Sequence, residues 1–178
     1  MSGRKNIMVM KIANTWLKHF FKKDELKFKQ KLDSDIKHKE EEKLRAKIRL
    51  EQIDKHIMNI LAIKSFCSWD EYTKYGLSGF GIEKYDEKVS FLKDGLEALI
   101  NDCSKPELAF NKNISDYAHE LNGTFSAASR VWHESVLGQD HDGEKSKAAG
   151  NFQLSMMTAK SLADSLKSIR NKLVLNDC

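Results

Sequence analysis

The chain has 178 residues, of which 40% are hydrophobic and 31% are charged, with nine glycines and one proline. This length suffices for one domain with a buried core, and so little glycine and proline excludes collagen-like and low-complexity chains. No run of about 18 apolar residues occurs, which excludes a membrane-spanning helix. The three cysteines form an odd set without C-x-x-C spacing. They indicate neither a disulfide framework nor a zinc site and are more typical of a reducing cytoplasm.

Charge is distributed unevenly along the chain. Residues 1–31 contain nine Lys or Arg residues against Asp24 and Glu25, which gives this segment a net charge of +7. The formal total is +4, so the rest of the chain carries −3. A basic segment before a mildly acidic body usually indicates a partner of opposite charge.

Residues 1–23 have the pattern of a basic amphipathic helix, with apolar residues at helical spacing and lysines on the other side. This helix either packs on the rest of the chain or lies on an anionic membrane surface, where aromatic side chains insert and lysines reach the headgroups. The membrane-binding residues would be Trp16, Phe20, Phe21, Lys18, Lys22 and Lys23. Nucleic acid is a less favoured partner, because only one of the nine basic residues is Arg.

Residues 24–64 predict a long helix, because neither Gly nor Pro occurs between Arg4 and Tyr75. The run 37–43 contains no apolar residue and can be either a solvated stretch of helix or the loop of a helical hairpin. As one helix this segment would be about 60 Å long, more than the rest of the chain can cover. We therefore expect it to bind a second copy or another protein, in a possible coiled coil. The expected partner-binding residues are Phe28, Leu32, Ile36, Ile53 and Ile57.

Residues 65–178 predict a bundle of antiparallel helices joined by short loops. Ser68 to Glu71 has the form of a capping box, and the segment around Pro106 is expected to end one long helix and cap the next. Three long amphipathic patterns follow these signals. Their apolar positions are Ile82, Tyr85, Val89, Leu92, Leu96, Leu99 and Cys103, then Ile114, Tyr117, Leu121, Phe125, Ala128 and Trp132, and finally Phe152, Met156, Ala159, Leu162 or Ala163, Leu166, Ile169 and Leu173. The fold class is therefore all-α.

One short segment carries a family resemblance. Residues 117–123, Tyr-Ala-His-Glu-Leu-Asn-Gly, resemble the phosphorylatable histidine box of histidine kinases and histidine phosphotransfer proteins. The resemblance implies a phosphoacceptor at His119, exposed on the flank of a helical bundle, with Gly123 leaving room for an incoming aspartyl phosphate. Asn122 stands where many of those proteins carry a basic residue, and Thr124 stands where the kinases carry a proline.

Other site patterns fail on spacing. Neither His119-Glu120 nor His133-Glu134 is followed by the second histidine of an H-E-x-x-H zinc motif. With Gly143 as the turn glycine of a calcium loop, Gly138 falls at the first carboxylate position. The sequence therefore predicts no metal, no cofactor and no catalytic residue. It favours a non-enzymatic cytoplasmic protein that assembles through its long helix, with membrane-surface binding and then phosphotransfer as alternatives.

Overall fold

The computed structural model describes residues 3–77, 81–108, 110–137 and 142–176, with side chains described for residue 22 and from residue 25 onward, apart from 76–77, 107, 142 and 176. All regular structure in these ranges is helical, which confirms the all-α fold class. The elements are α1 (Gly3–Phe66), α2 (Trp69–Tyr72), α3 (Lys74–Leu77), α4 (Gly81–Cys103), the 3₁₀ turn η1 (Pro106–Leu108), α5 (Lys112–Leu137) and α6 (Asp142–Asn176). The chain divides into two compact units, Met1–Arg45 and Ala46–Cys178.

The first unit consists of the N-terminal part of α1. From Gly3 onward, the two segments predicted as separate helices, 1–23 and 24–64, belong to this one element. The charged run 37–43 is helical, so the hairpin alternative for this run is wrong. Each of its side chains is exposed, and Nδ1 of His38 lies 3.5 Å from Oε1 of Glu42, one turn away. Polar pairs at this spacing support a solvated helix without any cover.

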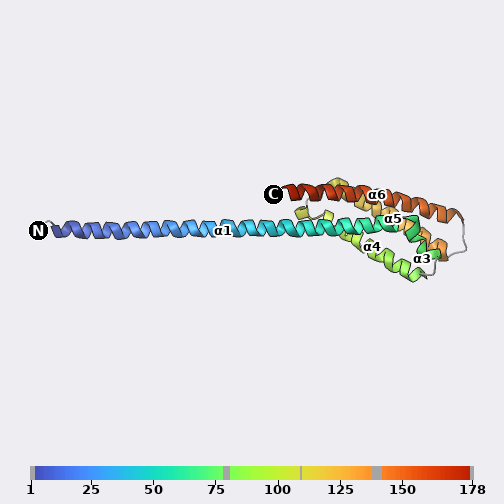
Figure 1. Cartoon of the computed structure of the whole chain (residues 1–178), viewed down its shortest axis with the longest axis horizontal. Helices are drawn as coiled ribbons and strands as arrows, with labels where there is room; N and C mark the ends of the chain where they lie inside the picture. The colour runs from blue at the N-terminus through green and yellow to red at the C-terminus, as the bar shows by residue number, and fades with distance from the viewer. Residues whose placement is uncertain (1–2, 78–80, 109, 138–141, 177–178) are drawn as a thin grey trace. The chain divides into compact units, whose positions relative to one another are not determined.

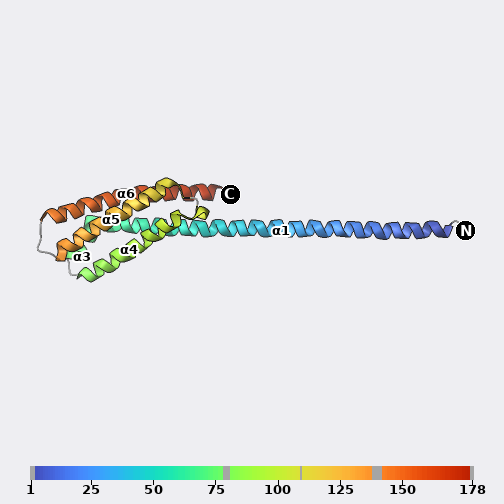
Figure 2. The same ribbon diagram turned by 180° about the vertical axis from the view of Figure 1, so that it is seen from behind.

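The second unit is a helical bundle whose core lies between residues 46–66 of α1 and the helices α4, α5 and α6 (Figures 1 and 2). Cross-helix contacts show that successive long helices run antiparallel. Between α1 and α4, His56 contacts Asp102 and Asn59 lies beside Gly95, so the order of contacts is reversed. Between α5 and α6, Thr124 contacts Ser155 and Glu120 contacts Thr158, again in reversed order. Tyr85, near the start of α4, contacts Ser129 in the second half of α5. The predicted antiparallel bundle is therefore confirmed.

The amphipathic patterns of the three later helices face this core. The buried members are Tyr85, Val89, Leu92, Leu96 and Leu99 on α4, Ile114, Leu121, Phe125, Ala128 and Trp132 on α5, and Phe152, Ala159, Leu162, Ala163 and Leu166 on α6. One end of the core is aromatic, with Tyr72 stacked on Phe152 at a centroid distance of 4.2 Å and Trp132 edge-on to Tyr72 at 5.0 Å. Aromatic pairs in such geometries stabilise a core beyond the area that they bury.

Two predicted helix boundaries are confirmed, because α2 begins directly after Ser68 and α4 ends at Cys103, but the capping contacts predicted with them are wrong. Ser68 has an extended backbone before α2, but its side chain makes no capping hydrogen bond, and the Glu71 carboxylate accepts a 2.6 Å hydrogen bond from Lys74 instead of returning to Ser68. The segment around Pro106 forms η1 and does not cap α5. Asn111 takes that role, because its Oδ1 accepts a 3.0 Å hydrogen bond from the Ile114 amide.

Candidate interaction surface

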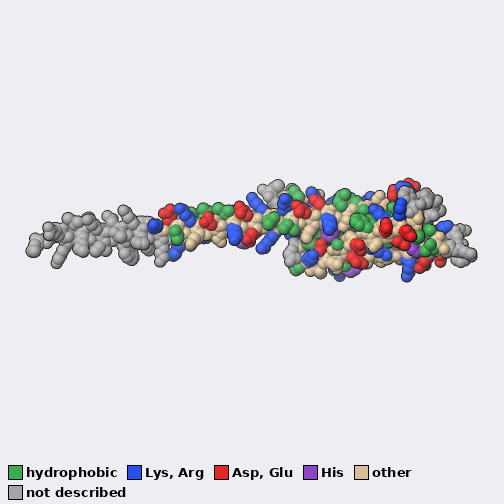
Figure 3. All heavy atoms as spheres, turned by 90° about the horizontal axis from the view of Figure 1, so that it is seen from below, with side chains coloured by type: hydrophobic (Ala, Val, Ile, Leu, Met, Phe, Trp, Pro, Cys, Tyr) green, Lys and Arg blue, Asp and Glu red, His purple; other side chains and the backbone are tan. Residues whose placement is uncertain are grey.

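An apolar stripe is exposed in the first unit. Its members are Phe28, Leu32 and Ile36, whose side chains are 68%, 47% and 48% exposed. With 3.6 residues per turn, Phe28 and Ile36 lie about 40° to either side of Leu32 on the helix surface. We call these three residues the first-unit stripe. Figure 3 shows hydrophobic side chains at the surface of this part of the chain, among lysines and carboxylates.

The surroundings of the first-unit stripe are fully solvated. Every described side chain from residue 25 to residue 45 is exposed. Nζ of Lys29 lies 3.4 Å from Oε1 of Glu25, and both side chains are about two-thirds exposed. Ion pairs of this kind contribute only a few tenths of a kcal/mol to a helix. The stripe therefore lies on a helix that gains little stability from its own side chains.

Ile53 and Ile57 do not belong to this surface, which corrects part of the predicted partner-binding set. Ile53 is fully buried and Ile57 is 7% exposed, and both pack in the core of the second unit. The sequence has apolar positions at helical spacing on both sides of the charged run 37–43, but α4, α5 and α6 cover only those in the second unit. A partner can reach Phe28, Leu32 and Ile36 but not these two residues.

The predicted membrane-binding residues fall almost entirely outside the described side chains. Trp16, Lys18, Phe20, Phe21 and Lys23 lie on α1, but their side chains are not among those described. Lys22 is exposed. No helix in the described ranges is both long enough and apolar enough to cross a membrane.

His119 is exposed on α5, one turn before the exposed Gly123. A Cβ added at Gly123 would meet no atom within 4 Å outside its own local helix. The space beside His119 is therefore open, as transfer of a phosphoryl group from an aspartyl phosphate would require.

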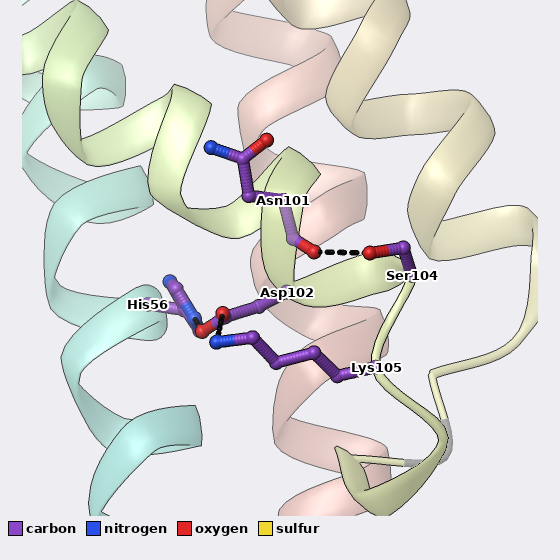
Figure 4. A network of polar contacts seen from close by, with 5 residues as sticks. All are labelled: His56, Asn101, Asp102, Ser104 and Lys105. Carbon is purple, nitrogen blue, oxygen red and sulfur yellow. Dashed lines mark hydrogen bonds and ion pairs between the residues drawn. The ribbon is translucent and has the colours of Figure 1, made fainter.

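A partly buried polar network joins α1 to α4 in the second unit (Figure 4). His56 is 3% exposed, and its Nε2 lies 2.8 Å from Oδ2 of Asp102. The other carboxylate oxygen of Asp102, Oδ1, lies 2.6 Å from Nζ of Lys105. Burial raises the pKa of the Asp102 carboxyl, but the hydrogen bonds from Lys105 and His56 outweigh it and hold this pKa below the ordinary 3.8. His56 Nδ1 is buried without a partner in the described residues.

This network was not predicted from the sequence. The only available signal is that His56 and Arg49 lie seven residues apart beside apolar positions of α1, where buried polar groups need partners. Arg49 donates to the Leu108 carbonyl at 3.1 Å, and Arg170 of α6 pairs with Asp54. The described residues contain no cluster of three or more His, Cys, Asp or Glu side chains suited to a metal. These contacts therefore fasten α1 to the other helices of the bundle.

No protein-family model, curated protein or solved structure matches this chain.

Proposed function

We propose that this chain is a helical assembly protein that binds another copy of itself through the first-unit stripe. The observation that carries the proposal is the exposure of Phe28, Leu32 and Ile36 on one face of a helix whose described side chains are all exposed up to Arg45. Most helices in proteins are stabilised by packing of an apolar face. Contiguous exposed apolar residues commonly mark interaction sites.

The expected association is moderate and depends on concentration. Covering a half-exposed Leu, Ile or Phe side chain contributes about 1 kcal/mol, so the six side chains of two stripes contribute about 6 kcal/mol. Association itself costs about 4 kcal/mol or more in lost translational and rotational freedom. The two amounts are comparable, so monomers and dimers should exchange and not form a permanent complex.

Sedimentation equilibrium of the full chain tests this function. The mass should rise above 20.4 kDa with concentration, and Phe28→Asp with Ile36→Asp should hold it at the monomer value. Leu26→Asp with Leu44→Asp is the matched control, because both residues are exposed and lie about 120° around the helix from Leu32. A wild-type chain that stays monomeric, or equal loss of association in both double variants, would show that the stripe is not the interface.

Membrane-surface binding through residues 1–23 remains a separate prediction. Under it, the full chain sediments with vesicles containing anionic lipid at low salt, and Trp16→Ala with Phe20→Ala reduces the bound fraction. Binding should also decrease as salt rises, because screening weakens the attraction of the lysines to the headgroups. Failure to sediment with anionic vesicles at low salt would remove this hypothesis.

Phosphotransfer through His119 is the second alternative, and the exposure of His119 beside the open space at Gly123 favours it. Incubation with a protein carrying a labelled aspartyl phosphate should then transfer the label to this chain. His119→Gln should abolish the transfer, whereas His38→Gln, at another exposed histidine, should leave it unchanged. Labelling that is absent, or equal in both variants, would exclude this role.

A further inference from the structure

The charge of the first unit changes sign at Leu32. Residues 22–31 contain five lysines against two carboxylates, for a net charge of +3. Residues 33–42 contain five carboxylates against two lysines, for a net charge of −3 with His38 neutral. The two segments have equal length, and the exposed Leu32 separates them at the centre of the first-unit stripe.

We propose that two copies of this chain pair in antiparallel orientation through their first-unit stripes, with Leu32 facing Leu32. This inference rests on the proposed self-association and adds its orientation and register. The register places Phe28 of each copy opposite Ile36 of the other. It also brings the +3 segment of each copy alongside the −3 segment of its partner, which is favourable at both ends of the contact.

The positions of the charges around the helix support this register. Lys29 and Asp35 lie about 60° to either side of Leu32, at the edges of the stripe. Lys31 and Asp33 flank them at about 100°. In the antiparallel pair, Lys29 of one copy therefore lies beside Asp33 of the other on one side of the apolar contact. On the opposite side, Lys31 of one copy lies beside Asp35 of the other. All four side chains are exposed in the single chain.

Other arrangements of the same two helices pair their charged and apolar side chains less favourably. A parallel pair in register puts Lys29 of each copy beside Lys31 of the other, and Asp33 of each copy beside Asp35 of the other, so that like charges meet. Moving the antiparallel centre from Leu32 to Ser34 places Phe28 opposite Glu40. The existing ion pair between Lys29 and Glu25 does not oppose the proposal, because an exposed pair of this kind rearranges at little cost.

Disulfide trapping in the full chain tests the orientation. Glu25 and Lys39 are each seven residues from Leu32 and about 20° from it around the helix, so they face each other across the proposed pair. The two Glu25 positions of one pair are then about 21 Å apart along the helix, too far for a disulfide. Glu25→Cys mixed with Lys39→Cys should give a cross-linked dimer under mild oxidation, and neither variant alone should.

The trapping has a matched control and a defined background. Lys27 and Lys37 are also at the same level in the proposed register, but both lie about 140° from Leu32 around the helix. Lys27→Cys mixed with Lys37→Cys should therefore not cross-link. Cys103→Ser and Cys178→Ser remove two native thiols. Cys67 can stay, because it is 3% exposed and burial raises the pKa of its thiol to about 12.

Salt dependence of the wild-type mass supplies an independent reading. Opposite charges across an antiparallel contact attract, so raising the salt should weaken association. Like charges across a parallel contact repel, so raising the salt would then strengthen association.

The outcomes separate this proposal from the proposed function. Cross-linking in the mixture alone, together with weaker association at high salt, supports the antiparallel pair. Cross-linking of Glu25→Cys with itself, or association that strengthens with salt, overturns the orientation while self-association through the stripe stands. A wild-type mass of 20.4 kDa at every concentration overturns self-association and the orientation with it.

Discussion

Gly95 and Gly123 are both inside long helices, but only Gly95 lies against another helix. A Cβ added at Gly95 of α4 would lie 2.9 Å from Nδ2 and 3.3 Å from Cβ of Asn59 on α1. A Cβ added at Gly123 of α5 would meet nothing within 4 Å. The absence of a side chain at Gly95 is therefore what lets α4 approach α1 closely in the second unit.

The two glycines should respond in opposite ways to alanine. Gly123→Ala should raise the free energy of unfolding by about 0.5–1 kcal/mol, because glycine is the poorer helix former. Gly95→Ala gains the same propensity but forces Asn59 to move, and overpacking of this kind costs about 1–3 kcal/mol. Urea unfolding of both variants measures the difference. Equal stabilisation by both would contradict the close approach.

Asp102 should make stability depend on pH in the acid range. Its pKa is lowered in the folded chain, so the ionised carboxylate stabilises the fold above the unfolded-state pKa of 3.8, and this contribution is lost as pH falls through the folded value. Asp102→Asn should lower the free energy of unfolding by about 1–3 kcal/mol at pH 7, because it weakens the contacts to His56 and Lys105.

The pH dependence is the distinguishing measurement for Asp102. The gap in stability between wild type and Asp102→Asn, from urea unfolding at several pH values, should narrow as pH falls below about 4. Ser104→Ala is a nearby control, since the Ser104 hydroxyl bonds only the Asn101 carbonyl in the described contacts and lies at the exposed surface. A gap that stays constant down to pH 2 would mean that the Asp102 charge does not stabilise the fold.

At the scale of single residues, the sequence predicts burial better than polar pairing. Tyr85 and Leu121 are buried as their spacing predicts, because an apolar helix face can be buried by a neighbouring helix in any register. The contact between His56 and Asp102 depends on which turn of α4 packs against which turn of α1, and Gly95 permits that close approach. A single sequence does not contain this register, so the network was missed.

At the scale of elements, α1 combines segments with different support. From Ile53 to Phe66 one apolar face of α1 is buried in the second unit, whereas residues 25–45 are exposed. The buried residues on this face are Ile53, Ile57, Ile60, Ile63 and Phe66. A solvated helix is only marginally stable by itself. The sequence predicted helix along both segments because neither contains a breaker. It could not predict which segment the chain itself covers, because apolar residues at helical spacing occur on both sides of the charged run 37–43.

Amide hydrogen exchange should separate the two segments. In dilute full-length chain, amides of residues 25–45 should exchange much faster than those of residues 53–66, because opening an uncovered helix exposes no core. Protection of 25–45 should increase at higher protein concentration, since dimerisation covers the first-unit stripe. Phe28→Asp with Ile36→Asp should remove this increase. Equal protection of both segments in dilute solution would contradict the described exposure.

At the scale of the whole chain, the division into two units assigns stability and association to different residues. Among the described side chains, every member of the second unit's core comes after Arg45. The described side chains of the first unit include the exposed stripe, and none of them belongs to that core. The sequence predicted both a bundle and an exposed helical surface, and it placed Ile53 and Ile57 on the wrong side of this division because periodicity alone does not distinguish a partner's cover from the chain's own.

The chain shortened to residues 46–178 should therefore fold without the first unit. Its melting temperature, followed by near-ultraviolet circular dichroism of the aromatic core around Trp132, should lie within about 4 °C of the full chain's at low concentration, which corresponds to less than about 1 kcal/mol. The same shortened chain should sediment as a monomer at every concentration, because it lacks the first-unit stripe. A matched shortening that removes only residues 1–21 keeps Phe28, Leu32 and Ile36 and should still associate. If the 46–178 chain associated as the full chain does, the interface would have to lie on the bundle, and if it failed to fold, residues before Ala46 would contribute to the core.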